Sequence, residues 1–183
     1  MISIYMEAVT VFKISLLAAM DKDRVLGDKG SEKLLWHFKR DLQYFKKLTE
    51  GEVVVMGKST FESLPSFARP LPNRVNLVLS RSLEGEIQGA HFGDFKRIIS
   101  LARSLQKKGK EVFVIGGASV YELFLKQDLV DRVYLTRINS SYKDKAKEPV
   151  YFPSFENDFK LTESKKDEES GIELYFEKWE RKA

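Results

Sequence analysis

The sequence contains no cysteine and only two histidines, His37 and His91, among its 183 residues. Without cysteine the chain cannot form disulfides or thiolate metal sites, and two histidines are too few for a histidine-rich metal site. We therefore expect no metal. No apolar run reaches the length of a membrane span, and the first residues lack the basic start of a signal peptide. These absences predict a cytoplasmic protein that does not enter a membrane.

Charge of one sign is not in large excess: 31 basic residues are set against 27 acidic ones, a net charge of +4. Both signs are mixed along most of the chain, so a solvated surface explains the charge better than nucleic acid binding does. The composition is typical of a globular protein, and the length suits one domain. We expect this domain to span residues 14–183, after an N-terminal extension over residues 1–13 that is either an extra edge strand or an artefact of the chosen start codon.

Apolar runs of strand length alternate with segments of helical periodicity, which predicts a single α/β domain with a central, mostly parallel, twisted sheet and about four helices. Two further strands near the C-terminus flank an acidic turn over Asp167–Gly171, which predicts an antiparallel hairpin. The polar segment Asn139–Lys147 is predicted to be a loop. The predicted strands are Ile14–Met20, Glu52–Met56, Asn76–Ser80, Glu111–Ile115, Asp131–Ile138, Phe159–Lys165 and Ile172–Trp179, and the helices are Leu35–Thr49, Ser59–Leu64, Asp94–Lys107 and Ser119–Lys126, with Asp94 as an N-cap.

Asp41 lies on the first predicted helix beside an apolar stripe that includes Phe38 and Phe45. Such a carboxylate is most simply a boundary residue that faces water. If it instead faces an apolar cleft, desolvation raises its pKa, and the residue becomes a functional candidate. A carboxylate in that setting pairs well with a planar, amidine-like edge, because two parallel donors fit its two oxygens.

Two glycine segments, Gly57–Thr60 and Gly116–Ser119, each follow an apolar strand and open a helix. Such junctions present free backbone N–H groups to a phosphate, and two of them can hold one pyrophosphate. By itself, however, a glycine pair is more often a turn or a helix cap. Neither segment matches the Rossmann fingerprint or the Walker A loop.

Five segments in this order resemble the dihydrofolate reductase family, in its bacterial, NADPH-dependent form. The resemblance extends from about Ile14 to about Trp179. It implies hydride transfer from NADPH to C6 of the pterin and protonation at N5. It also implies a monomer whose partners are dihydrofolate and antifolate-like small molecules. The segments are Ile14–Ala19, Leu35–Asp41, Val55–Thr60, Arg69–Arg74 and Val114–Ala118.

The resemblance assigns a role to individual residues. Asp41 holds the pterin, Arg74 pairs with the α-carboxylate of the glutamate tail, and the bond between Gly116 and Gly117 is expected to be cis. Lys58, Ser80 and Arg81 match contacts to the 2′-phosphate. The implied catalytic set is Asp41, Trp36, Tyr121 and Thr136; the substrate set is Leu17, Ala19, Leu42, Phe45, Leu64, Leu71, Arg74 and Ile115; the cofactor set is Ala19, Leu26, Gly57, Lys58, Ser59, Thr60, Ser80, Arg81, Gly116, Gly117, Ala118, Ser119 and Val120.

The chain departs from the family pattern at three places. Leu35 replaces the usual proline before Trp36, Pro65–Ala68 is longer than in compact members, and Glu148–Val150 replaces the usual Gly-Asp-Thr. The sequence therefore does not decide whether the loop over residues 27–35 closes over the nicotinamide. Two other functions also stay open: a related pyrimidine reductase of flavin synthesis, which does not predict Trp36, Asp41, Phe45 and Arg74 together, and a non-catalytic module that binds NADPH or a pterin.

Overall fold

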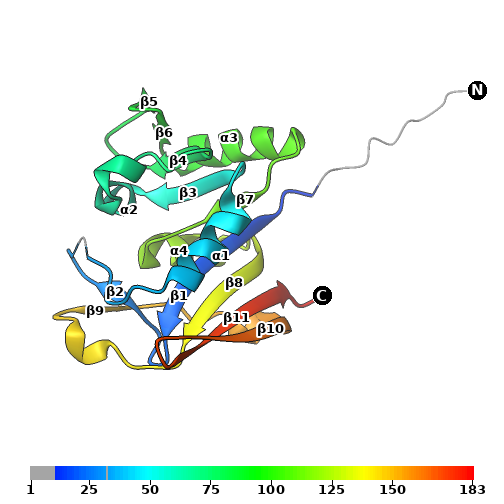
Figure 1. Cartoon of the computed structure of the whole chain (residues 1–183). Coiled ribbons are helices and arrows are strands. Elements are labelled where there is room, and N and C mark those ends of the chain that lie inside the picture. Colours follow the sequence, from blue (N-terminus) through cyan, green and yellow to red (C-terminus); the bar gives the residue numbers. More distant parts are fainter. Residues whose placement is uncertain (1–10, 32) are drawn as a thin grey trace, which may run out of the picture.

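The computed structural model describes residues 11–31 and 33–183, and a nine-stranded sheet forms its centre (Figure 1). The strands in the order β8-β1-β7-β3-β4-β6 are parallel, and antiparallel strands complete both edges. The predicted α/β fold with an antiparallel C-terminal hairpin is therefore confirmed. The parallel strands are β1 (Ile14–Asp21), β3 (Val53–Gly57), β4 (Val75–Leu79), β6 (Ala90–Gly93), β7 (Val112–Val114) and β8 (Val130–Ile138); the antiparallel ones are β5 (Gly85–Ile87), β10 (Phe159–Glu169) and β11 (Ile172–Arg181).

Helices cover both faces of this sheet. α3 (Phe95–Lys107) and α4 (Ala118–Lys126) pack on β1, β3, β7 and β8 in one hydrophobic cluster. α1 (Lys39–Thr49) and α2 (Lys58–Ser63) contribute Phe45 and Phe61 to a second cluster, with the residues of β3 and β4 that point the other way. Asp94 caps α3 as predicted, because its Oδ1 accepts a hydrogen bond from the Arg97 amide at 2.9 Å. Short 3-10 turns cover Ser66–Ala68, Lys143–Lys145 and Glu156–Asp158.

Helix α1 begins at Lys39, so the predicted start at Leu35 is wrong. The segment before Lys39 is not helical, and its side chains alternate: Trp36 and Phe38 are buried, and the residue between them is exposed. Both rings pack against β8 and β11 in a third cluster. The helical spacing in the sequence concealed this alternation, because Leu35 and Phe38 also fit a period of 3.6. As a result Asp41 lies in the first turn of α1 and not in its middle.

The C-terminal hairpin is tighter than predicted. β10 extends to Glu169 and β11 starts at Ile172, which leaves Ser170 and Gly171 as the turn. Both turn residues have positive φ, 53° and 76°, as two-residue hairpin turns require. The prediction placed Asp167–Gly171 in the turn, and the first three of these residues belong to β10 instead.

A separate two-stranded sheet pairs β2 (Val25–Asp28) with β9 (Pro149–Tyr151). Neither strand is predicted from the sequence, because both are too short to show an alternation. The loop predicted from residue 27 therefore begins inside β2. The Asp28 carboxylate also accepts a hydrogen bond from the Glu148 amide at 2.7 Å, which fastens the end of this pair.

The polar segment Asn139–Lys147 is a loop as predicted, apart from its short 3-10 turn. The extra edge strand considered for the N-terminal extension falls largely on residues 1–10, which lie outside the described ranges. None of the described helices combines the length and the apolar character needed to cross a membrane.

Candidate active site

Asp41 is a partly buried carboxylate in the first turn of α1. Burial raises the pKa of Asp41, the nearby Thr136 hydroxyl opposes that rise, and the negative charge of Glu169 adds to it. Thr136 on β8 is 1% exposed, yet its Oγ1 makes no hydrogen bond of normal geometry within the described chain. A buried hydroxyl without such a bond is rare in folded proteins. The two residues therefore have hydrogen-bonding capacity that the protein itself does not use.

The Tyr121 phenol closes the same site from α4. Its hydroxyl donates to the Leu17 carbonyl on β1 at 2.7 Å. Burial raises the pKa of Tyr121, and the charge of Asp41 raises it further, so the phenol stays protonated at neutral pH. Ala19 on β1 lies opposite Thr136 in the strand register. The structure thus gathers these predicted residues near Asp41, toward the carboxyl ends of β1 and β8.

Trp36 supports the segment that leads into α1. It is 9% exposed, and its ring contacts Tyr142 with centroids 5.2 Å apart. Together with Phe38 it packs against β8 and β11. The position of the first turn of α1 therefore depends on this buried ring.

Predicted substrate contacts also lie together on the face covered by α1 and α2. Phe45, Leu64 and Ile115 are partly buried and pack against the cluster that contains Leu71. Leu42, one turn before Phe45 on α1, is 44% exposed. This helix therefore presents apolar surface that the described protein does not cover, as a ligand site requires.

Arg74 is fixed beside this apolar group. Its Nε donates to Thr49 Oγ1 at 3.1 Å, its Nη1 donates to the Pro72 carbonyl at 3.0 Å, and its guanidinium carbon lies 5.8 Å from the centroid of the Phe45 ring. Thr49 ends α1 and is fully buried. Burial lowers the pKa of Arg74, and Glu50 opposes that effect; the guanidinium stays charged. Its remaining N–H groups suit a carboxylate.

Asn76 is a residue that the sequence analysis missed. It is 1% exposed, its Oδ1 accepts from the Leu71 amide at 2.9 Å, and its Nδ2 donates to the carbonyls of Leu71 and Arg74 at 3.0 and 3.2 Å. Its amide thereby sets the shape of the loop that carries Arg74. A signal was present, because an asparagine inside an apolar strand is seldom buried unless it bonds to backbone.

A groove of about 520 Å³ runs along the starts of α2, α3 and α4 and past the end of β4. Most of the predicted cofactor contacts line it, together with four residues that were not predicted. Asp94 is one of these four; it was predicted only as a helix cap and not as a residue that lines the groove. The predicted lining residues are Gly57, Lys58, Ser59, Thr60, Ser80, Arg81, Gly117, Ser119 and Val120, and the others are Leu79, Asp94, Phe95 and Leu123.

The two glycine junctions are joined directly: the Gly57 amide donates to the Gly116 carbonyl at 2.9 Å. The bond between Gly116 and Gly117 is cis, as predicted. Gly116 has φ +121°, and a Cβ there would lie 3.3 Å from the Tyr121 hydroxyl; a Cβ on Gly57 would lie 3.1 Å from Val120 Cγ2. Position 116 therefore needs glycine, whereas a Cβ on Gly57 would require the Val120 side chain to move by a few tenths of an ångström.

The remaining predicted cofactor contacts do not line this groove. Gly116 is buried, and Ala118 is the first residue of α4. Ala19 lies on β1 opposite Thr136. Leu26 on β2 packs against the main core cluster. The described residues contain no cluster of three or more potential metal ligands.

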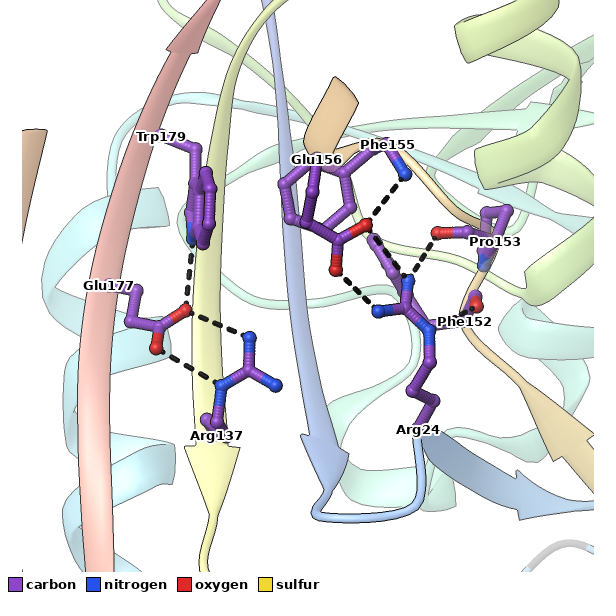
Figure 2. A network of polar contacts seen from close by, with 8 residues as sticks. All are labelled: Arg24, Arg137, Phe152, Pro153, Phe155, Glu156, Glu177 and Trp179. Atoms are coloured by element: carbon purple, nitrogen blue, oxygen red, sulfur yellow. Dashed lines mark hydrogen bonds and ion pairs between the residues drawn. The ribbon is translucent and has the colours of Figure 1, made fainter. Parts of the chain in front are cut away.

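Arg24 fastens the segment after β1 to the segment after β9 (Figure 2). Its guanidinium donates to the carbonyls of Phe152 at 3.3 Å and Pro153 at 2.8 Å and pairs with Glu156. Burial works to raise the pKa of Glu156, but hydrogen bonds from Arg24 and from the Phe155 amide outweigh it and bring that pKa below its ordinary value. The charges in this contact are thus matched inside the protein.

A second ion pair lies on the same side of the sheet (Figure 2). Arg137 Nε donates to Glu177 Oε1 at 3.1 Å, and Trp179 Nε1 donates to Glu177 Oε2 at 2.9 Å. The Trp179 ring in turn packs edge-on against Phe155. This network joins β8 to β11 and supports the segment that Arg24 holds.

A family model described as dihydrofolate reductase matches residues 13–181. The dihydrofolate reductase of Bacillus subtilis (strain 168) is 37% identical over 175 residues, which cover 92% of this chain and 95% of that protein. That of Staphylococcus haemolyticus is 30% identical over 169 residues, covering 92% and 96%. That of Aedes albopictus is 27% identical over 190 residues, covering 92% and 97%.

Proposed function

The chain belongs to the dihydrofolate reductase family, and from this premise we propose that it reduces 7,8-dihydrofolate to 5,6,7,8-tetrahydrofolate with NADPH. The observation that carries the proposal is the desolvated Asp41 carboxylate beside the buried Thr136 hydroxyl. A pterin offers its 2-amino group and an adjacent ring N–H, two parallel donors that fit a carboxylate. The apolar setting strengthens both bonds, because little water competes for them.

The other parts of the substrate match the rest of the site. Leu17 and Ala19 provide a floor under the pterin. Phe45 and its apolar neighbours accept the aromatic middle of the molecule. Arg74 binds the α-carboxylate of the glutamate tail with the N–H groups that Thr49 and Pro72 leave unused. The apolar neighbours assigned here are Leu42, Leu64, Leu71 and Ile115.

The groove along β3, β4 and β7 fits a phosphorylated dinucleotide. Lys58 and Arg81 bring positive charge to its lining, and Thr60 and Ser80 bring hydroxyls. No side chain caps the N-terminus of α4, so its backbone N–H groups remain for a phosphate. The cation and hydroxyl pair Ser80 and Arg81 favours a 2′-phosphate, and hence NADPH over NADH. When bound, NADPH supplies the hydride that reduces C6 of the pterin.

Reduction also requires a proton at N5. Asp41, whose pKa is raised by burial, is assigned to the edge of the ring opposite N5. The proton therefore reaches N5 through water. Tyr121 does not deliver it, because its hydroxyl already donates to the Leu17 carbonyl and its pKa is raised. The main contribution of the protein is the alignment of two rings in a site poor in water.

The two alternatives differ in what they leave unexplained. The related reductase of flavin synthesis gives no role to Asp41, Phe45 and Arg74 together, and the family match does not favour it. A non-catalytic module that binds NADPH or a pterin gives these residues a role but no reaction. A turnover assay separates it from an enzyme.

The decisive experiment follows the absorbance of NADPH after dihydrofolate is added to the purified protein. We expect turnover in the wild type and a fall in kcat/KM of about 100-fold or more at pH 7 in Asp41→Asn. The affinity for NADPH should not change. Binding of NADPH without turnover in the wild type would favour the module. Equal turnover in both proteins would remove Asp41 from the mechanism.

We also propose that the enzyme is a cytoplasmic protein and a monomer. A single chain carries every residue assigned above, which supports the monomer. Analytical ultracentrifugation of the active protein tests the second part. A dimer at the concentration of the assay would contradict it.

A further inference from the structure

Helix α1 has no cap of its own. Its N-cap residue is Phe38, whose side chain cannot accept a hydrogen bond and packs in the core. The amides of Lys39 and Arg40 instead donate to Glu169, to Oε2 and Oε1 respectively, each at 2.9 Å. Both belong to the amides that a helix leaves without an internal partner. The carboxylate that caps α1 thus comes from the last residue of β10, about 130 positions along the chain.

A second contact fastens the same turn. Arg40 Nη1 donates to both carboxylate oxygens of Asp167, at 2.9 and 2.7 Å. The C-terminal hairpin therefore binds two backbone amides of the first turn of α1 and also the Arg40 side chain in that turn. Asp41 is the next residue. The other strand of the hairpin, β11, pairs with β8, where Phe176 lies opposite Thr136. One hairpin thus supports both Asp41 and its hydroxyl neighbour.

We propose that Glu169 is a positioning residue of the reaction, which caps α1 so that Asp41 meets the pterin in the right place. This inference rests on the proposed function. A free helix N-terminus carries a partial positive charge, which would stabilise the ionised form of a carboxylate in the first turn. Glu169 occupies these amides and offsets that charge.

The other groups around Asp41 do not supply this effect. Burial is the main cause of the raised pKa of Asp41, and Glu169 is the charged residue that adds to it. Thr136 on β8 opposes the rise. Tyr121 on α4 and Tyr44 on α1 are neutral phenols whose pKa values are also raised by burial, that of Tyr44 to about 12. The cation on the same turn, Arg40, is paired with Asp167, and the adjacent His37 is exposed.

The experiment compares Glu169→Gln with Glu168→Gln, a matched control. Glu168 is the neighbouring residue, it is exposed, and its carboxylate makes no hydrogen bond or ion pair to the described residues. In Glu169→Gln we expect kcat to fall about fivefold, while the KM for NADPH stays unchanged. The midpoint of the pH profile of kcat should move about half a unit toward acid, because a neighbouring negative charge is lost. The control should behave like the wild type.

A purely structural cap would lower the melting temperature without moving the pH midpoint, and that result would overturn the proposal. The titration of the Asp41 carboxyl carbon, followed by NMR in the same proteins, needs no turnover. It separates the two proposals if the wild type proves inactive with dihydrofolate. A lower midpoint in Glu169→Gln supports the role of Glu169. The same midpoint in all three proteins contradicts it, whatever the activity.

Discussion

Glu156 and Asp41 are both partly buried carboxylates, and they differ in the groups that face them. Glu156 accepts hydrogen bonds from Arg24 and from the Phe155 amide, which hold its pKa below the ordinary value (Figure 2). Asp41 faces a hydroxyl and another acid, and burial holds its pKa above the ordinary value. The first region satisfies its charges within the chain and serves the fold. The second leaves capacity for a ligand, which is how a binding site differs from a structural contact.

The largest expected change in stability comes from removing the ion pair between Arg24 and Glu156. Glu156→Gln removes the charge that pairs with Arg24, and we expect a loss of about 1.5 kcal/mol in the free energy of unfolding. Because the folded pKa of Glu156 is lowered, the loss should be complete at pH 7. It should shrink as the pH falls below about 4 and wild-type Glu156 also becomes protonated. Thermal unfolding at several pH values measures this.

Glu163→Gln is the matched control, since Glu163 pairs with Lys178 at the surface and is exposed. Its melting temperature should stay close to that of the wild type. Equal losses in both variants would show that the Arg24 contact is no stronger than a surface pair.

The second expected change has the opposite sign. Asp41→Asn removes a carboxylate that burial disfavours, so we expect a melting temperature roughly 2 to 4 °C higher at pH 7, the shift that about 1 kcal/mol produces at this length. Because the folded pKa of Asp41 is raised, the gain should diminish as the pH falls through that pKa and the wild-type residue takes up its proton. A lower melting temperature at pH 7 would mean that Asp41 is satisfied within the protein and would end the contrast with Glu156.

The smallest expected change is in the KM for dihydrofolate and concerns the Thr49 hydroxyl, which is hydrogen-bonded within the chain and also contacts Arg74 of the proposed substrate site. Thr49 is fully buried, donates to the Phe45 carbonyl at 2.8 Å and accepts from Arg74. Thr49→Val keeps the shape and removes both bonds, so we expect the KM for dihydrofolate to rise about threefold. The KM for NADPH should not change, and neither should that for a dihydropterin without a glutamate tail. An equal rise for the tailless substrate would show that Thr49 does not act through Arg74.

The sequence predicts those parts of the fold that depend on residues adjacent in the chain. Apart from β6 (Ala90–Gly93), which was missed, the parallel strands were predicted because each is an apolar run, and the glycine junctions because a glycine and a helix start follow such a run. The groove follows from them, since strands such as β3 and β7 end at the same edge of the sheet. Asp41 was found by resemblance, and its periodicity alone favoured a residue that faces water.

The parts that were missed depend on contacts between distant residues. The start of α1 is set by Glu169 and by the packing of Trp36 and Phe38 on β8 and β11. Glu169 and these two strands are all distant from it in sequence. Arg24 likewise acts on a segment more than 120 positions away. Asn76 was hidden in an otherwise apolar strand. A pattern of neighbours cannot contain such information, because the partners meet only in the folded state.

The capping of α1 by Glu169 also has a consequence for the order of assembly during synthesis. β1 emerges first from the ribosome, but its neighbours in the sheet are β7 and β8, and the acid that completes the first turn of α1 follows later still. Long-range pairing of this kind delays folding, because distant segments must meet before the contacts form. A nascent chain that stops before residue 169 therefore lacks the finished turn that carries Asp41, so the Asp41 carboxylate is set in place only after β10 has been synthesised.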